Sequence, residues 1–191
     1  MPETAFRPMT LDEFLRWDDG TDTRYELIGG FPIAMAPAGE AHGVLAARMA
    51  ARLENALASR RPCRAAMEAG VVRPDRADSF FVADIAATCA PYQPGRQFVQ
   101  DPMLIVEILS PSTERHDRRI KLPVYQQIAS VQELLLLASD EIYAELHRRQ
   151  GDQWVIQIIP AGGSLKLDSV GIEGSLAELY DGLAVSAEGA G

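Results

Sequence analysis

The chain has no long hydrophobic run. None of its 191 residues lies in an uninterrupted apolar stretch of about 18 residues or more, so we expect no membrane-spanning helix. The first residues, which include Glu3 and Arg7, lack the apolar core of a signal peptide. Internal repeats and linker-like segments are absent too. We therefore expect a cytoplasmic protein that folds as a single domain, 1–191.

Cysteine is scarce. Cys63 and Cys89 are the only two, and they do not have the spacing of a metal-binding motif. Nothing else in the sequence indicates a secreted protein. Because disulfides are rare in the cytoplasm, this context favours two reduced thiols over a disulfide.

Positive charge is also in short supply. The chain has 18 Lys and Arg residues against 27 Asp and Glu residues, which gives a formal net charge of −9. This balance argues against a surface built for non-specific binding to nucleic acid. A local basic groove is still compatible with it.

One apolar stretch organises the rest of the chain. In the segment 101–113, Pro102 and Pro111 enclose a β-branched run of strand length. Continuous apolarity predicts a central strand that is covered on both faces. The period of two places Glu107 on the same face as Ile105. A lone ionised carboxylate is costly there unless it is paired, bound to a metal or placed at the edge of a cleft.

The remaining pattern predicts alternating helices and strands, typical of an α/β (α+β) fold with a mixed sheet flanked by helices. A four-residue repeat of apolar side chains predicts a long helix from about His42 to about Ser59. Pro123 is awkward inside a helix, so we expect the following helix to begin near Lys121. Capping boxes at Thr10/Glu13 and at Ser175/Glu178 predict two short helices. Strands are expected at Arg24–Gly30, Phe31–Met35, Glu68–Arg73, Phe80–Ala86, Glu133–Ser139, Ile142–Arg148 and Trp154–Ile159.

Four charged residues are candidates for chemistry: Glu26, Asp84, Glu107 and Lys121. Asp84 is a second acid inside an apolar strand. Two acids that face the same way on neighbouring strands repel each other unless a cation lies between them. Mg²⁺ or Mn²⁺ accepts such oxygens, and it polarises a phosphate and lowers the pKa of bound water. With a nearby lysine, this is the minimal apparatus for phosphodiester hydrolysis.

Several motifs together resemble a known family. They are Tyr25-Glu26-Leu27-Ile28, His42 at a helix start, Ala83-Asp84-Ile85, and Val106-Glu107-Ile108-Leu109-Ser110-Pro111-Ser112-Thr113 followed by Asp117, Lys121 and Tyr125. Over roughly residues 9–182, this set resembles the Uma2-type putative restriction endonucleases of the PD-(D/E)XK nuclease superfamily. The Val106–Thr113 block with its following spacing is the specific part of the match.

The resemblance implies a restriction-endonuclease-like core that cleaves DNA with Mg²⁺ or Mn²⁺. It implies that Asp84 and Glu107 are metal ligands, and that Glu26 is a further ligand or orients metal-bound water. Lys121 would be the catalytic lysine, since Leu109 occupies the usual position. His42 would line the cleft. The chain departs from the family pattern at Ala83, at Gly29-Gly30, at Leu134-Leu135 and at Pro123.

Structural alternatives remain for each of these residues. Glu107 could be a buried acid paired with a basic residue, Asp84 a turn cap and Glu26 a half-exposed strand residue. Lys121 could be solvated, and His42 could merely pack on its own helix. The group Arg115, Arg118 and Arg119 could bind phosphates or form a solvated basic face.

These alternatives leave three functions open. The first is a metal-dependent DNA endonuclease, expected as a homodimer because a duplex has two strands to cut. The second is a non-catalytic binding or assembly protein on a nuclease-like fold. The third is an enzyme that hydrolyses a different phosphoester.

Overall fold

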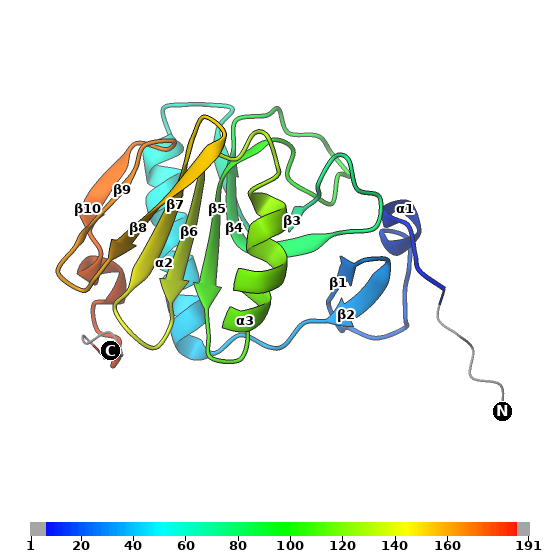
Figure 1. The fold of residues 1–191 in the computed structure, drawn as a ribbon, viewed down its shortest axis with the longest axis horizontal. Helices are drawn as coiled ribbons and strands as arrows, with labels where there is room; N and C mark the ends of the chain where they lie inside the picture. Colours follow the sequence, from blue (N-terminus) through cyan, green and yellow to red (C-terminus); the bar gives the residue numbers. More distant parts are fainter. Residues whose placement is uncertain (1–6, 187–191) are drawn as a thin grey trace.

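The computed structural model describes residues 7–186 and is built on one six-stranded sheet (Figure 1). Residues 1–6, where we expect no signal peptide, and 187–191 lie outside the described part. The strand order is β3-β4-β5-β6-β7-β8, and all neighbours are antiparallel except β5 and β6. The strands are β3 (Arg64–Val71), β4 (Phe81–Thr88), β5 (Pro102–Leu109), β6 (Glu133–Ala138), β7 (Ala144–Gln150) and β8 (Gln153–Ile159).

Strand β5 lies between β4 and β6, as its continuous apolarity predicts. Leu104 and Val106 are fully buried in the core on one face of the sheet. Ile105 is buried in the core on the other face, and Glu107 lies on that same side. The predicted central strand covered on both faces is confirmed, with its one acid pointing into a buried layer.

Helix α2 (Glu40–Leu57) covers one face of the sheet and lies behind it in Figure 1. Its four-residue repeat, Leu45, Met49, Leu53 and Leu57, is completely buried. Burying a leucine-sized side chain contributes about 1.5–3 kcal/mol, so this stripe fixes the helix on the sheet. Because the helix begins two residues before His42, that histidine lies in its first turn.

A continuous helical segment covers the other face, in front of the sheet in Figure 1. It consists of α3 (Glu114–His116), a π-helical turn (Asp117–Lys121) and α4 (Leu122–Tyr125). The regular helix α4 begins at Leu122, next to the predicted start near Lys121, but it continues helical turns from Glu114 onward that were not predicted. In the π turn the Leu122 N–H donates to the carbonyl of Asp117, five residues back. The widened turn lets Pro123, which has no N–H to donate, follow without ending the helix.

Two short elements precede the sheet. Helix α1 (Leu11–Phe14) has the capping box that the sequence predicts. Strands β1 (Tyr25–Ile28) and β2 (Phe31–Ala34) form a hairpin, and Leu27 of β1 pairs with Phe80 just before β4. The Gly29-Gly30 turn has positive φ at both positions, which glycine adopts without strain.

The C-terminal part differs from the expectation. Two further strands, β9 (Ser164–Leu167) and β10 (Ile172–Ser175), form a hairpin that the sequence did not reveal. Ser175 pairs with Ser164 in this ladder, so it does not cap a helix. The short helix Ala177–Tyr180 is a 3-10 helix without a side-chain cap, and Glu178 instead pairs with Arg52 of α2.

The prediction of two reduced thiols was wrong, because Cys63 and Cys89 are joined in a disulfide. Arg64 and Thr88 are paired residues of β3 and β4, so Cys63 and Cys89 form the next cross-strand pair, with Cα atoms 3.8 Å apart. The register of β3 and β4 brings the two cysteines together, and the spacing of the cysteines in the sequence does not reveal this register. No helix within residues 7–186 is long and apolar enough to span a membrane. The cytoplasmic location stays a prediction, and the disulfide is a feature against it.

Candidate active site

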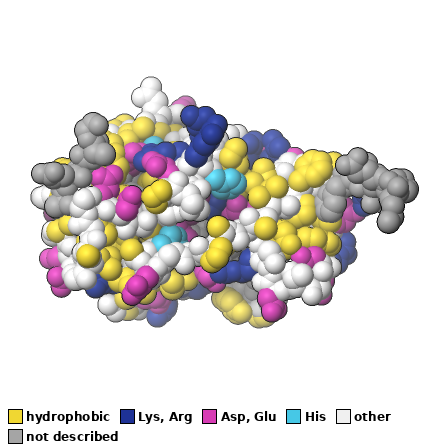
Figure 2. Space-filling view, turned by 90° about the horizontal axis from the view of Figure 1, so that it is seen from below, with side chains coloured by type: hydrophobic (Ala, Val, Ile, Leu, Met, Phe, Trp, Pro, Cys, Tyr) yellow, Lys and Arg dark blue, Asp and Glu magenta, His cyan; other side chains and the backbone are white. Residues whose placement is uncertain are grey.

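Five charged side chains from four parts of the chain meet beside the carboxyl-terminal half of β5. Glu107 comes from β5, Asp84 from β4, Glu26 from β1, and Asp117 and Lys121 from the π turn. Figure 2 views the end of the sheet at which β5 and β6 finish. Histidine side chains reach the surface in the middle of this face, beside acidic ones.

Lys121 lies at the centre of the cluster. Its Nζ is 3.1 Å from Glu26, 3.4 Å from Glu107 and 3.3 Å from Asp117, and it donates to the carbonyl of Val82 at 3.0 Å. The side chain is 8% exposed, so the solvated alternative does not hold. Burial by itself would lower the pKa of Lys121, but the three carboxylates raise it above its ordinary value. Lys121 is therefore a permanent cation inside an acidic pocket.

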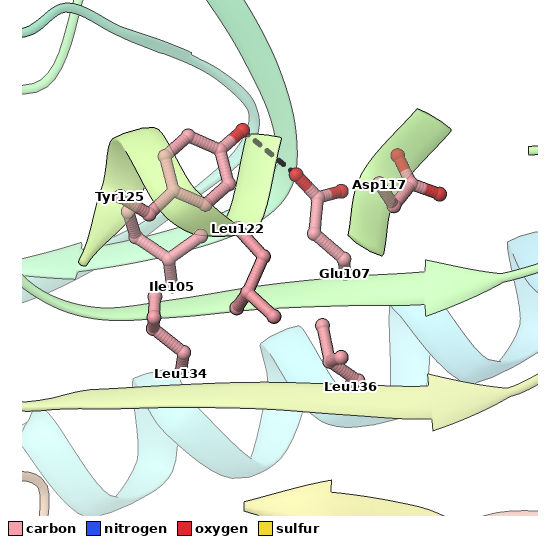
Figure 3. Close-up of a pocket in the computed structure, with 7 residues that line it drawn as sticks. All are labelled: Ile105, Glu107, Asp117, Leu122, Tyr125, Leu134 and Leu136. Atoms are coloured by element: carbon pink, nitrogen blue, oxygen red, sulfur yellow. Dashed lines mark hydrogen bonds between the residues drawn. The ribbon is translucent and has the colours of Figure 1, made fainter. Parts of the chain in front are cut away.

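Glu107 faces an apolar layer on one side and Lys121 on the other. The Tyr125 hydroxyl donates to its Oε1 at 2.8 Å, and the two side chains point toward each other in Figure 3. The gap around them, also lined by Ile105 and Leu122, has no room for a water molecule. Burial raises the pKa of Glu107 well above its usual value, Lys121 opposes this, and Asp84 and Asp117 raise the pKa further. Lys121 alone therefore does not neutralise the cluster.

Asp84 and Glu107 lie where β4 and β5 separate. The hydrogen-bonded ladder between these strands ends at the pair of Ile85 and Val106. Beyond it, Asp84 Oδ2 accepts the N–H of Ile108 at 2.6 Å, and Glu107 Oε2 lies 3.4 Å from the N–H of Asp84. The two carboxylates thus replace backbone acceptors and lie next to each other across adjacent strands. Neither pairs with an arginine among the described residues.

His42 reaches the same pair from α2. Its Nε2 is 3.2 Å from Asp84 Oδ2, and the ring is mostly buried. The hydrogen bond to Asp84 raises the pKa of His42, against the opposing effect of burial. Its Nδ1 is buried and has no hydrogen-bond partner within residues 7–186. His42 therefore orients Asp84, which remains partly open to solvent, and it does more than pack on its own helix.

Glu26 has both oxygens occupied. Oε1 accepts the N–H of Val82 at 2.9 Å, and Oε2 bonds to His116 Nε2 at 3.0 Å. Burial raises the pKa of Glu26, but the bond to His116 and the charge of Lys121 lower it overall. Because the residue is buried, the half-exposed alternative does not hold. Its position suits the placement of Lys121 better than the direct binding of a metal.

Comparison with known proteins gives a family for the chain. The family model described as "Uma2: Putative restriction endonuclease" matches residues 11–178, which is most of the chain. The chain belongs to this family.

One relative and one solved structure align with nearly the whole length of this Uma2 chain. The uncharacterized protein slr1290 of Synechocystis sp. is 28% identical over 96% of this chain and 97% of its own. A crystal structure of a putative nuclease belonging to DUF820 from Anabaena variabilis has a TM-score of 0.74 and 21% identity. That alignment covers 91% of this chain and 98% of the other. The predicted family and the predicted mixed-sheet, nuclease-type fold are both confirmed.

Some residues of the site were not singled out as catalytic by their sequence. His116 was missed entirely, and it holds Glu26 in place. Asp117 and Tyr125 belong to the motifs that carry the resemblance but were given no catalytic role; Asp117 contacts Lys121, and Tyr125 donates to Glu107. The only available signal was that Asp117, Lys121 and Tyr125 are four residues apart on one helical face.

The arginines predicted to line the cleft lie differently in this Uma2 chain. Arg118 pairs with Glu114 and with Glu145, each at 2.7 Å, so its guanidinium is already neutralised. Arg115 is exposed. The alternative of a basic face that balances nearby acids therefore describes Arg118 better than a phosphate site does.

The Arg118 contact gives a first prediction. Hydrogen bonds from His147, Arg118 and Tyr143 lower the pKa of Glu145 to about 2. A depressed carboxyl pKa stabilises the fold above the unfolded-state value near 4.5, and this stabilisation is lost as pH falls toward 2. We expect Glu145→Gln to remove on the order of 2 kcal/mol at neutral pH, allowing for partial solvent screening, and much less near pH 2.5.

Urea unfolding between pH 2.5 and 7 measures this difference. The matched control is Glu114→Gln, which removes the more exposed partner of the same arginine. A constant loss across the pH range would contradict the prediction.

The residues fit a divalent ion in part. Within residues 7–186, no group of three or more His, Cys, Asp or Glu side chains is arranged to hold a metal. Mg²⁺, however, keeps several waters and is often held by only one or two carboxylates. Asp84 and Glu107 provide two such groups, with an excess of negative charge around them. Glu26 does not complete the set, because Lys121 lies between it and Glu107.

Proposed function

We propose that this protein is an endonuclease that hydrolyses DNA phosphodiester bonds with Mg²⁺ or Mn²⁺. The observation that carries the proposal is the pair Asp84 and Glu107 at the point where two strands separate, beside a buried lysine. Burying two carboxylates whose negative charge is not balanced costs free energy unless they bind a cation. Membership of the Uma2 family and the shared fold support the same assignment.

The side chains have distinct roles in this proposal. Asp84 and Glu107 would hold the ion, which when bound supplies a Lewis acid for the phosphate and lowers the pKa of a water. Lys121 donates to the attacking water or to the charge that develops on the phosphate. Glu26 and Asp117 hold the Lys121 ammonium in position. His42 fixes the orientation of the Asp84 carboxylate.

The surface offers room for a substrate next to these groups. A cleft of about 280 Å³ lies on the other side of Val82, whose backbone contacts Glu26 and Lys121. Phe14, Trp17 and Tyr25 are among its lining residues. Aromatic side chains stack on unpaired bases, so this cleft suits a nucleotide flanking the bond that is cut.

Plasmid cleavage tests the proposal. Supercoiled DNA is incubated with the protein and Mn²⁺ or Mg²⁺, next to Asp84→Asn and Glu107→Gln. Losing a partner of a metal ligand usually costs 10–100-fold, so we expect loss of a ligand itself to cost at least about 100-fold. Asp168→Asn, an exposed acid on the far side of β6, is the matched control. Cleavage that neither site substitution affects would end the assignment.

A non-catalytic binding protein on the same fold is the second candidate. It is favoured by the net charge of −9, by Leu109 at the usual lysine position and by the internal contacts of Lys121. Calorimetry with Mn²⁺ separates the two candidates. Heat that disappears in Asp84→Asn supports the enzyme, whereas no heat and no cleavage support the binding protein. A panel of single-stranded DNA, duplex DNA and RNA identifies the third candidate, an enzyme for a different phosphoester.

A homodimer is also part of the proposal. Each chain provides one cluster of this kind, and two strands of a duplex call for two. Sedimentation at micromolar concentration tests this directly, and a strictly monomeric protein would count against it.

A further inference from the structure

Strand β8 is an edge of the central sheet, and its own sequence lacks the usual protection of an edge. Its sequence, Gln-Trp-Val-Ile-Gln-Ile-Ile, contains no charged residue and no proline. Natural proteins normally protect such edges with lysine, proline, a bulge or a covering segment, because open backbone groups recruit other strands. Among the described residues, β7 is the only strand hydrogen-bonded to β8.

Most side chains of β8 are exposed as well. Val155, Ile156 and Ile158 are 43%, 55% and 52% exposed, and they are three of the large hydrophobic side chains on the surface of residues 7–186. Ile156 and Ile158 point to the same face as Trp154. The helical segment in front of the sheet ends before it reaches this strand (Figure 1). Arg149 lies over the Trp154 ring at 4.5 Å and holds it in place.

We propose that β8 pairs antiparallel with β8 of a second copy of this chain, about a two-fold axis at Ile156. In this register Ile156 faces Ile156 of the second copy, and Trp154 faces Ile158. One face then carries an uninterrupted ladder of aromatic and β-branched side chains, which stabilises paired strands. The unpaired backbone groups of alternate residues find partners across the axis.

The neutral sequence of β8 allows the partner to be an identical chain. Each copy has a net charge of −9, so two copies repel unless they meet at a neutral surface. β8 provides such a surface, with no charged residue between Gln153 and Ile159. An isologous contact also needs a patch that is complementary to itself, and a strand with an apolar residue at its midpoint meets this condition.

The symmetry has a consequence for the proposed nuclease. Antiparallel pairing of the edge strands runs the two β5 strands in opposite directions. The two acidic clusters then open at opposite ends of the joined sheet and act on separate phosphodiester bonds. This arrangement differs from a dimer that cuts both strands at one base pair. If the proposed function holds, nicked plasmid accumulates before linear plasmid.

Sedimentation and cysteine cross-linking test the interface without using activity. We expect wild-type dimers at micromolar concentration, and monomers for Ile156→Lys, because two lysines would meet at the axis. Ile33→Lys, a similarly exposed position on β2, should remain dimeric. Circular dichroism melting checks that both variants are folded.

The cross-link fixes the register. Directly opposite residues have Cα atoms about 4.5–5.5 Å apart, within disulfide range, so Ile156→Cys should form a disulfide-linked dimer on mild oxidation. Cys63 and Cys89 are already joined, so the new thiol is the free one. Ile158→Cys is the control, since its two copies would lie roughly 14 Å apart along the strands. A monomeric wild type, or equal cross-linking at both positions, would overturn the proposal even if DNA cleavage is observed.

Discussion

Lys121→Met is expected to lower the free energy of unfolding by about 3–5 kcal/mol. The ammonium is the shared counter-ion of Glu26, Glu107 and Asp117, all of which are buried. Methionine fills a similar volume but leaves these carboxylates without a counter-charge, and breaking a buried ion pair on one side costs this much. Urea unfolding at pH 7–8 measures the loss. The variant should also be inactive in the plasmid assay.

The chain offers a close control for this substitution, because Lys166 is its only other lysine. Lys166 has an exposed side chain that lies 3.7 Å from Asp168, so Lys166→Met should cost at most about 0.5 kcal/mol. If charge is the cause, the stability loss should also depend on pH. Without Lys121 the pKa values of the carboxylates rise, so the loss in free energy of unfolding caused by Lys121→Met should become smaller as pH falls toward 5. Equal stability of the two lysine variants would show that the ion cluster does not hold the fold together.

Removing the disulfide is expected to cost about 3.5 kcal/mol. Cys63 and Cys89 close a loop with a sequence separation of 26, and loop-closure entropy for that length predicts a loss of this size. The double variant Cys63→Ala, Cys89→Ala should unfold at lower urea concentration, with the denaturant dependence checked for change. The same shift should appear when the wild-type protein is reduced.

Reductant also separates two explanations. Cys63 is buried, so truncating it removes packing as well as a covalent bond. Reductant should shift the wild-type curve and leave the double variant unchanged. If it shifts neither, the protein in solution carries the two free thiols that its sequence favoured, and the cost of the substitutions comes from packing.

Local sequence patterns were sufficient to predict most strands of the sheet and helix α2. The apolar run of β5 predicted a central strand, and the repeat from Leu45 to Leu57 predicted a buried helix face. The alternating runs Ile142–Arg148 and Trp154–Ile159 predicted the strands β7 and β8. These features depend on the period of a strand or a helix over a few residues, so a single sequence carries them.

Contacts between segments that are distant in the sequence were harder to predict. The sequence did not indicate that His116 would hold Glu26, or that Arg118 would be neutralised by Glu145. The disulfide was missed for the same reason. Each depends on which residues of two strands or helices are opposite, and a shift of one residue would change every partner. The π turn was not predicted either. It belongs to a helical segment that begins before Lys121, and it keeps Asp117 and Lys121 on one side.

By itself, the sequence determined the family, the mixed sheet and the unusual presence of Asp84 and Glu107 in apolar strands. Only the tertiary structure decided that Lys121 is buried among three carboxylates, and that Glu26 positions this lysine. The physical reason is that ionic contacts at 3–3.5 Å require side chains from several elements to converge, and convergence is a property of packing. The periodicity of a strand or helix determines the face on which each side chain lies, whereas the tertiary fold determines which residues that side chain contacts.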